Sequence, residues 1–413
     1  MGWNSWCTDS LCNLLGDDPC SEHMVKTTAD AMVSQGLVSL GYNYVALDDC
    51  WSAKTRDPAT GELQHDAKRF PNGMKHVADY VHSRGLLFGL YTSVGDKTCK
   101  GDRPGSYGHY EQDAQTLTGW GVDMVKMDHC GLAGNNHSDK DLYGNMSRAL
   151  NATGRPVLFS LCNWGEAQVW EWGDDIAQMY RIQMDHLPFW KFSGANRSAG
   201  VGVGQGTYDI IEWMAQLQPS KWTKQFGWMD PDFLMTLYPT MDFTASRTEY
   251  TFWALWSAPL LVSTDVRSLS KEKRAILMNK EVIAINQDAS ATAGDRIFVG
   301  SGPASAGAAN TAVQVWSRDL ANGDKCVVLY NSGAKNTSRY DSGGDGDLLV
   351  GVTWEMLGWD PGEQVEVRDL WAQATLGNFT DGFNATIKSR DVRMLRMKKR
   401  SLDISPVKRL LHV

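Results

Sequence analysis

The sequence contains no long apolar run, no sustained basic run before its end, and no cysteine motif of the kind that binds zinc. A membrane-spanning helix needs about 20 consecutive apolar residues, and no stretch reaches that length, so we expect no membrane insertion. The net charge is −8, and Lys and Arg cluster only in "RMKKR" near the C-terminal end. Because nucleic-acid binding requires a basic face, we expect no nucleic-acid partner.

The eight cysteines form no CxxC pair and no Cys/His cluster, so we expect disulfides rather than a zinc site. Disulfides form in oxidising compartments. Seven N-glycosylation sequons indicate the same route: Asn136, Asn145, Asn151, Asn196, Asn336, Asn378 and Asn384. The opening "MGWNSW" does not read as a signal peptide, so we expect a secretory protein whose leader is removed.

Eight short apolar segments punctuate the first 290 residues, and most of them end in polar or charged residues. They are "MGWNSW" and residues 42–51, 86–95, 122–131, 156–165, 177–186, 226–234 and 259–266. Helical spacing of apolar residues occurs between them, at 21–41, 74–85, 110–121 and 247–258. Continuous apolar strands that alternate with helices predict an α/β protein with a (β/α)8 TIM barrel. A doubly wound open sheet is the alternative, disfavoured because no strand leads directly into a glycine-rich phosphate-binding loop.

The character of the sequence changes after residue 288. Residues 299–312 are rich in Gly, Ala and Ser, and the segments that follow alternate polar and apolar residues between turns. Such alternation predicts antiparallel strands. We therefore predict a barrel domain over residues 1–290 and an antiparallel β domain over residues 291–413.

The segment "VDMVKMDHCG" (122–131) places two charged residues at the end of an apolar strand. Lys126 and Asp128 are two residues apart, so in an extended strand both point into the mouth of the barrel. The charge of Lys126 is expected to lower the pKa of the Asp128 carboxyl and keep it ionised, as a nucleophile requires. A buried structural ion pair is the alternative interpretation.

A second carboxylate, Asp185, ends the sixth apolar segment, with Arg181 four residues before it. The fourth and sixth strands of a barrel lie about 10 Å apart, so their side chains can bring two carboxyl groups to the roughly 5 to 5.5 Å of a retaining glycosidase. One carboxylate would attack the anomeric carbon, and the other, kept protonated by burial, would protonate the leaving oxygen. Strand-end Asp pairs also occur in barrels without this role.

Other strand-end residues suit sugar binding. Asp48 and Asp49 can accept hydrogen bonds from the vicinal hydroxyls of a sugar. Asp230 and Asp232 either cap a turn or bind sugar hydroxyls. Four tryptophans could stack on the apolar face of a pyranose, with core packing as the alternative for each: Trp6, Trp51, Trp164 and Trp228.

As an ordered set, these motifs resemble glycoside hydrolase family 27, which comprises α-galactosidases and α-N-acetylgalactosaminidases. The motifs are "MGWNSW", "LDDCW", "GLYTSVGDKTC", "PGSYGHYEQDAQTLTGWGVDMVKMDHC", "CNWG", "RIQMD", "DPD" and "APLLVSTDVR", and they span residues 1–290. The resemblance implies a barrel followed by a β-sandwich, in a secreted or lysosomal/vacuolar retaining enzyme that uses no metal or other cofactor. Family members occur as monomers and as oligomers, so a homodimer is compatible with the resemblance.

The resemblance also implies roles for individual residues. It makes Asp128 the nucleophile and Asp185 the acid/base, and it implies a pocket lined by Trp6, Asp48, Asp49, Tyr91, Cys99, Lys126, Arg181 and Asp232. The disulfides that it implies are Cys7 to Cys50, Cys12 to Cys20 and Cys99 to Cys130, with Cys162 and Cys326 free.

The residue after Cys162 bears on the sugar that the family resemblance implies. Typical α-galactosidases carry Glu there, vertebrate α-N-acetylgalactosaminidases carry Ser, and this chain carries Asn163. Asn163 can hydrogen-bond a 2-hydroxyl and, with Trp164, leaves little room for an acetamido group, which favours terminal α-linked galactose. The departures in "RIQMDH" and "WMDPDF" leave α-N-acetylgalactosaminidase, β-L-arabinopyranosidase and isomalto-dextranase activities open. A galactose-binding lectin is the non-enzymatic alternative.

Overall fold

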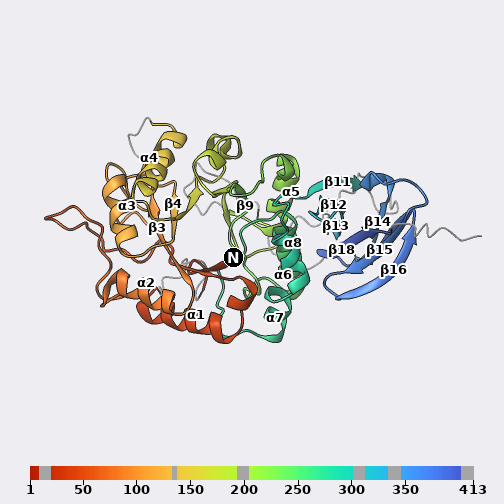
Figure 1. Ribbon diagram of the computed structural model, residues 1–413, viewed down its shortest axis with the longest axis horizontal. Coiled ribbons are helices and arrows are strands. Elements are labelled where there is room, and N and C mark those ends of the chain that lie inside the picture. Colours follow the sequence, from red (N-terminus) through yellow and green to blue (C-terminus); the bar gives the residue numbers. More distant parts are fainter. Residues whose placement is uncertain (9–19, 133–136, 193–203, 301–311, 334–345, 401–413) are drawn as a thin grey trace, which may run out of the picture.

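The computed structural model describes residues 1–8, 20–132, 137–192, 204–300, 312–333 and 346–400. A barrel and a smaller β-sandwich lie side by side along the long axis of the molecule (Figure 1). We propose the domain division near residue 290, because helix α8 ends at Asn286 and strand β11 begins at Asp295.

Eight parallel strands form the barrel, in the sheet order β10-β1-β2-β3-β4-β5-β6-β9. They are β1 (Gly2–Asn4), β2 (Tyr44–Ala46), β3 (Leu87–Ser93), β4 (Met124–Asp128), β5 (Leu158–Cys162), β6 (Met179–Arg181), β9 (Trp228–Asp230) and β10 (Leu261–Val262). A parallel bridge between Leu234, after β9, and Val262 in β10 joins the two edges of the sheet. Each strand lies within one of the eight predicted apolar segments, so the predicted barrel is confirmed.

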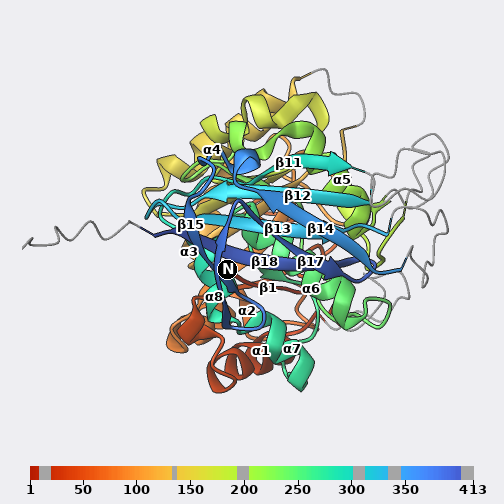
Figure 2. The same cartoon turned by 90° about the vertical axis from the view of Figure 1, so that its right-hand side faces the viewer.

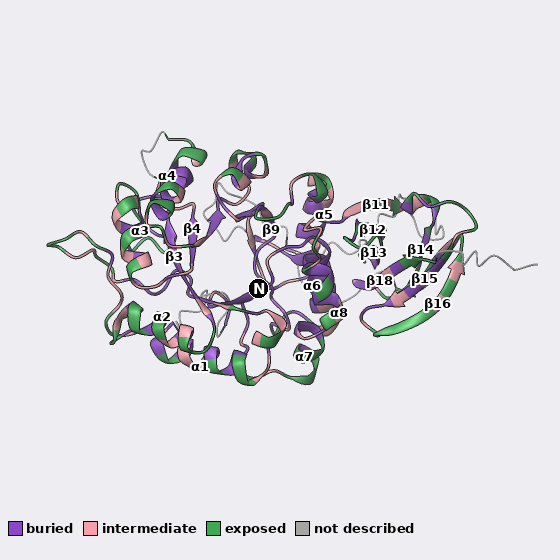
Figure 3. Cartoon of the chain, viewed as in Figure 1, coloured by how far each residue is buried: buried purple, intermediate pink, exposed green. Residues whose placement is uncertain are grey.

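Helices surround the barrel strands and bury one face against them (Figure 3). They are α1 (Glu22–Ser34), α2 (Gly73–Ser83), α3 (Tyr110–Gly119), α4 (Asp139–Ala152), α5 (Thr207–Leu217), α6 (Phe243–Leu255), α7 (Lys271–Leu277) and α8 (Lys280–Asn286). In α2 the buried residues Met74, Val77, Ala78 and Val81 follow helical spacing. Short 3-10 helices occupy Val38–Leu40, Glu166–Glu171, Gly173–Asp175, Pro219–Lys221 and Glu355–Leu357. No helix in the described ranges is both long enough and apolar enough to cross a bilayer.

The C-terminal domain is an antiparallel β-sandwich, as the resemblance implied. One sheet has the order β11-β12-β13-β18-β15-β16, and β14 pairs with β17 in the other. The strands are β11 (Asp295–Gly300), β12 (Val313–Asp319), β13 (Lys325–Asn331), β14 (Leu348–Thr353), β15 (Gln364–Asp369), β16 (Ala374–Thr380), β17 (Gly382–Ile387) and β18 (Asp391–Lys399). Successive residues of β12 face opposite sides: Val315 packs in the sandwich core and Trp316 packs against the core of the barrel.

Helix α6 lies between the barrel and the sandwich, and its burial reflects this position (Figures 1 and 2). Ten of its 13 residues are buried, in contrast to helices that face solvent. Arg247 of α6 donates to both carboxylate oxygens of Asp391 in β18 at 2.5 Å. Trp371 donates from Nε1 to Thr251 at 2.9 Å. The sandwich therefore packs against one side of the barrel, over helix α6.

Candidate active site

A cavity of about 130 Å³ lies at the carboxyl ends of the barrel strands, where TIM-barrel enzymes carry their active sites. Its lining residues are Trp6, Asp49, Tyr91, Cys99, Lys100, Lys126, Asp128, Trp164, Arg181, Asp185, Asp232 and Phe233. Of the predicted site residues, Trp6, Asp49, Tyr91, Cys99, Lys126, Asp128, Trp164, Arg181, Asp185 and Asp232 line the cavity, whereas Asp48, Asn163, Trp51, Trp228 and Asp230 do not. Lys100 and Phe233 were not predicted; each directly follows a predicted residue, which was the available signal.

Lys126, in β4, pairs directly with Asp48 rather than with Asp128. Its Nζ donates to Oδ2 of Asp48 at 2.8 Å, and it lies 4.8 Å from the centre of the Phe233 ring and 5.4 Å from that of Tyr91. Burial acts to lower the pKa of Lys126, but the charges of Asp48 and Asp128 outweigh it and raise that pKa above its usual range. Lys126 is therefore a buried, permanently charged group.

Asp128 ends β4 and is held by two hydrogen bonds. The Tyr91 hydroxyl donates to Oδ2 at 3.0 Å, and the backbone N–H of His129 donates to Oδ1 at 2.9 Å. Burial raises the pKa of Asp128; the charge of Lys126 opposes this, and the charge of Asp185 adds to it. The expectation that Lys126 leaves this pKa lowered is therefore wrong, because burial and the second carboxylate prevail.

Asp185 and Asp232 share the guanidinium of Arg181. Nη2 of Arg181 lies 2.9 Å from Oδ2 of Asp232 and 3.1 Å from Oδ1 of Asp185. Burial and the charge of Asp232 raise the pKa of Asp185 against the effect of Arg181. The Asp185 side chain is nevertheless 34% exposed, so this carboxyl can exchange protons with water. Asp185 begins strand β7 (Asp185–His186), which pairs with β8 (Gly204–Gln205).

Asp232 is held rigidly in an unusual backbone conformation. Its φ is +83°, which is uncommon for a residue with a side chain and often marks functional sites. Its carboxylate accepts from the backbone N–H groups of His186 at 2.6 Å and Phe233 at 2.7 Å. Asp230 caps this turn, because its Oδ1 accepts from the Asp232 N–H at 2.8 Å, and burial raises the pKa of Asp230 to about 6.

The second strand contributes a further carboxylate to the cavity wall. Asp49 accepts from the Lys100 backbone N–H at 3.0 Å. Burial raises the pKa of Asp49 to about 6, partly against this hydrogen bond. Carboxylates at this end of the cavity can accept hydrogen bonds from sugar hydroxyls.

The four candidate tryptophans separate into two groups. Trp6 and Trp164 line the cavity. Trp51 is buried, packs edge-to-face on Trp120, and donates to the backbone carbonyl of Tyr91 at 2.9 Å. Trp228 begins β9 and lines a different cavity at the amino ends of the strands. Stacking on a sugar is therefore excluded by position for Trp51 and Trp228, which the sequence pattern could not distinguish.

Asn163 does not line the cavity, contrary to expectation. Its amide nitrogen donates to the carbonyl of Glu166 at 2.8 Å and to Oδ2 of Asp139 at 3.3 Å. The next residue, Trp164, has a φ of +58°, which turns the chain so that Trp164 forms the wall instead. Direct contact between Asn163 and a sugar substituent is not part of this geometry.

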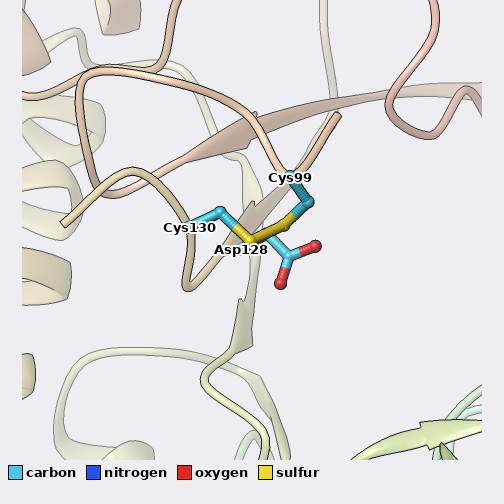
Figure 4. A group of neighbouring side chains, drawn as sticks. All are labelled: Cys99, Asp128 and Cys130. Carbon is cyan, nitrogen blue, oxygen red and sulfur yellow. A yellow bond between two sulfur atoms is a disulfide. The ribbon is translucent and has the colours of Figure 1, made fainter. Parts of the chain in front are cut away.

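One of the three predicted disulfides is confirmed and the other two are wrong. Cys99 pairs with Cys130, beside Asp128 (Figure 4). Cys50 pairs with Cys20, not with Cys7, because Cys20, just before α1, lies with its Cα 6.0 Å from that of Cys50. This also rules out Cys12 to Cys20. Cys7 is itself disulfide-bonded, and Cys12 lies outside the described residues. Cys162 and Cys326 are free and buried, as expected.

Cys99, Asp128 and Cys130 also lie as close together as metal ligands would (Figure 4). Metal binding by cysteine requires a thiolate. Both sulfurs are used in the disulfide, so the donor set does not fit a metal ion.

Comparisons with known proteins identify the family of this chain. Residues 1–288 match the family model "Alpha galactosidase A", and residues 310–397 match "Alpha galactosidase C-terminal beta sandwich domain". An α-galactosidase of Cyamopsis tetragonoloba is 35% identical over 97% of this chain and 86% of its own, and one of Coffea arabica is 36% identical over 95% and 92%.

Solved structures give the same result. The crystal structure of α-galactosidase I from Mortierella vinacea is 34% identical, covers 96% of both chains and superposes with a TM-score of 0.83. The α-galactosidase of Saccharomyces cerevisiae, solved with raffinose, is 28% identical over 97% of both chains, with a TM-score of 0.82. Together with the barrel, the sandwich and the cavity, these matches show that the chain is a glycoside hydrolase that belongs to the α-galactosidase family, glycoside hydrolase family 27.

Proposed function

We propose that this protein hydrolyses terminal α-linked galactose in oligosaccharides or glycoconjugates, with retention of anomeric configuration. The observation that carries the proposal is that Asp128 and Asp185 line one cavity and influence one another, since the charge of Asp185 raises the pKa of Asp128. Two interacting carboxyl groups titrate as a pair, so one can be ionised while the other keeps its proton. Relatives that are named α-galactosidases support galactose as the sugar.

In the first step, an oxygen of the Asp128 carboxylate attacks the anomeric carbon and forms a galactosyl ester. Asp185 donates its proton to the glycosidic oxygen, so the leaving group departs as a neutral alcohol. The hydrogen bonds from Tyr91 and His129 aim the carboxylate of Asp128. Lys126 and Arg181 supply the positive charge that offsets the carboxylates around the sugar.

In the second step, water cleaves the ester. Asp185, now ionised, takes a proton from the water as its oxygen attacks the anomeric carbon, and Asp128 leaves as a carboxylate. The exposed fraction of the Asp185 side chain, 34%, supports access of this water. Two inversions give net retention, and both carboxyl groups return to their starting protonation states.

Replacement of the nucleophile tests this assignment. Asp128→Gly is expected to lower kcat/KM by about a thousandfold or more, and azide should restore part of the turnover of an activated α-galactoside as the β-galactosyl azide. Asp360→Gly, which changes an exposed aspartate of the sandwich, is the matched control and should retain activity. Unchanged activity of Asp128→Gly, or rescue that yields the α-azide, would contradict the assignment.

The glycone follows from a panel of aryl α-glycosides. We expect the α-galactoside to have a higher kcat/KM than the α-N-acetylgalactosaminide, the β-L-arabinopyranoside and the isomaltoside. A higher kcat/KM for any of the other three glycosides would replace galactose by that sugar as the proposed glycone. Binding of galactose by calorimetry with no turnover of any glycoside would support the lectin alternative.

The compartment and the oligomeric state belong to the same proposal. Two disulfides in the described residues support a secretory or vacuolar route, and the sequon residues Asn151, Asn378 and Asn384 are exposed. A mass decrease after endoglycosidase treatment of protein made in a eukaryotic host would test glycosylation. The homodimer stays a prediction from the family resemblance, and light scattering tests it.

A further inference from the structure

A groove of about 490 Å³ adjoins the catalytic cavity and shares Trp164 with it. Its walls carry two more tryptophans, Trp170 and Trp213, whose rings meet edge-to-face with centroids 6.2 Å apart. Its volume exceeds the roughly 130 Å³ of the catalytic cavity, and it has no part in the reaction steps described above.

The groove lies on the acid/base side of the cavity. Gln183, which lines the groove, is two residues before Asp185 in the same segment. Pairing of β7 with β8 sets Gln205, another groove residue, directly opposite His186. The acid donates its proton to the leaving oxygen, so the leaving group must extend from this side of the cavity. The groove is therefore placed where the rest of a bound oligosaccharide would continue.

The groove offers the contacts that sugars require. Trp164, Trp170 and Trp213 are each partly exposed and provide flat apolar surface, on which the faces of pyranose rings stack. Carboxamides provide both donors and acceptors for hydroxyl groups, and three side chains of this type line the groove: Gln168, Gln183 and Gln205.

Two of these carboxamides have an unmet acceptor. Gln183 is only 4% exposed; its Nε2 donates to the carbonyl of Pro231 at 2.9 Å, while its Oε1 has no partner among the described residues. The Oε1 of Gln205 is likewise without a partner there. Buried polar atoms of folded proteins are nearly always hydrogen-bonded, and an exception calls for an explanation. Both oxygens are buried as well as unpaired, so a sugar hydroxyl reaches them only when these side chains turn toward the groove.

The loop that carries Trp164 and Gln168 is held in a fixed and costly conformation. The φ values of Trp164, Ala167 and Gln168 are +58°, +50° and +51°, and such conformations persist only when their surroundings enforce them. The Trp172 Nε1 donates to the carbonyl of Ala167 at 2.9 Å. A binding wall that is fixed before the ligand arrives loses less freedom on binding.

We propose that this groove binds the leaving-group side of an oligosaccharide, so that the preferred substrates carry at least two sugar units beyond the galactose. This inference rests on the proposed α-galactosidase function. Stacking on the tryptophans and hydrogen bonds to the exposed Gln168 hold those units while Asp185 protonates the oxygen of the bond between them and the galactose.

Two substrates separate the groove from the cavity. α-Galactosyl fluoride has a leaving group too small to reach the groove, whereas an α-galactosyl trisaccharide spans it. Trp170→Ala is expected to lower kcat/KM for the trisaccharide about tenfold, the loss of one stacking contact, and to leave the fluoride within about twofold. Gln168→Ala, which removes an exposed side chain and should not affect folding, is expected to lower the trisaccharide value by about threefold.

Phe226→Ala is the matched control, because Phe226 is an aromatic residue with 64% exposure that is not among the groove-lining residues. It should leave both substrates unchanged. Equal losses on both substrates, or no loss on the trisaccharide in either groove variant, would overturn the groove proposal and leave the proposed function intact. A parent enzyme that turns over neither substrate would overturn the proposed function, and the groove proposal with it.

Discussion

Two walls of the cavity use the same kind of charge arrangement and differ in how firmly it is held. In the β4 wall, Lys126 lies among Asp48 and Asp128; in the β6 wall, Arg181 lies between Asp185 and Asp232. In each wall the cation is nearest to the carboxylate that does not take part in bond making, at 2.8 Å for Asp48 and 2.9 Å for Asp232.

The difference lies in the two reacting carboxyl groups. Asp128 is a buried residue that accepts hydrogen bonds from Tyr91 and His129, whereas Asp185 is only partly buried and is held by Arg181. A nucleophile must be aimed at one carbon, and an acid/base must exchange protons with water. The comparison teaches that the surroundings of each carboxyl group, more than its sequence motif, distinguish the two roles.

Asp185→Asn should give the largest effect within this comparison, because it removes the proton donor but not the nucleophile. We expect kcat/KM for a galactosyl oligosaccharide to fall by about a hundredfold to ten-thousandfold, and the value for galactosyl fluoride, which needs no proton, to fall much less. The alkaline limb of the pH profile should also disappear, since protonated Asp185 no longer limits activity. Equal losses on both substrates would show that Asp185 is not the acid.

Lys126→Met should destabilise the β4 wall and change the titration of Asp128. It leaves the buried Asp48 without its cation, and loss of one partner of a buried pair destabilises a protein by about 3 to 5 kcal/mol. The charge of Lys126 opposes the rise in the pKa of Asp128, so the acidic limb of the activity profile should move to higher pH. Thermal unfolding and pH-dependent kinetics measure the two effects.

The double variant Lys126→Met with Asp48→Asn is the control for this experiment. It removes both charges, so it should recover stability without recovering activity. Recovery of activity as well would show that Lys126 acts only through folding.

Tyr91→Phe should have a smaller effect on the same wall. It removes one of the two hydrogen bonds to Asp128 and leaves the ring, so we expect kcat/KM to fall about tenfold with little change in the melting temperature. Because the hydroxyl stabilises the ionised form of Asp128, the acidic limb should also move to higher pH. A melting temperature that falls sharply while the pH profile stays fixed would indicate a structural role.

Glu249→Gln, behind the β6 wall, should produce the smallest change in kcat/KM, and its main effect should be on stability. Burial raises the pKa of Glu249 to about 8, and the backbone N–H of Met235 donates to it at 2.6 Å. A carboxyl group with a raised pKa in the folded state loses its stabilising effect as the pH rises from its ordinary value of 4.5 to about 8. Between pKa values of 4.5 and about 8 this loss amounts to about 4 kcal/mol at pH 8. The neutral variant should therefore be more stable than the parent by up to that amount at pH 8, and equally stable at pH 4, by chemical denaturation.

Much of the fold was predictable, because strands buried inside a barrel carry continuous apolar runs. All eight segments contain a strand. Helix α4 was not predicted, although Leu142, Met146, Ala149 and Leu150 follow helical spacing and Ser138 caps its start. The polar residues between them obscured the pattern.

The site was predictable as a set of strand ends and not in its details. Strand order alone brings residues after β2, β4, β6 and β9 to one rim. The pairing of Lys126 with Asp48 depends on side-chain geometry across three strands. Asn163 faces away from the cavity because Cys162, the residue before it, lies in register with the inward-facing Asp128. The predicted pairing rests on the family resemblance, because cysteine spacing alone cannot determine connectivity, and this chain departs from the family pattern at Cys20.

The central claim is that Asp128 forms a covalent bond to the sugar. Mass spectrometry of the enzyme after incubation with a fluorinated α-galactosyl substrate, whose fluorine slows hydrolysis of the ester, tests it directly. We predict a galactosyl adduct on the peptide that contains Asp128, and its loss in Asp128→Gly. An adduct on Asp185 or on another residue, or turnover with inversion of configuration, would contradict the account.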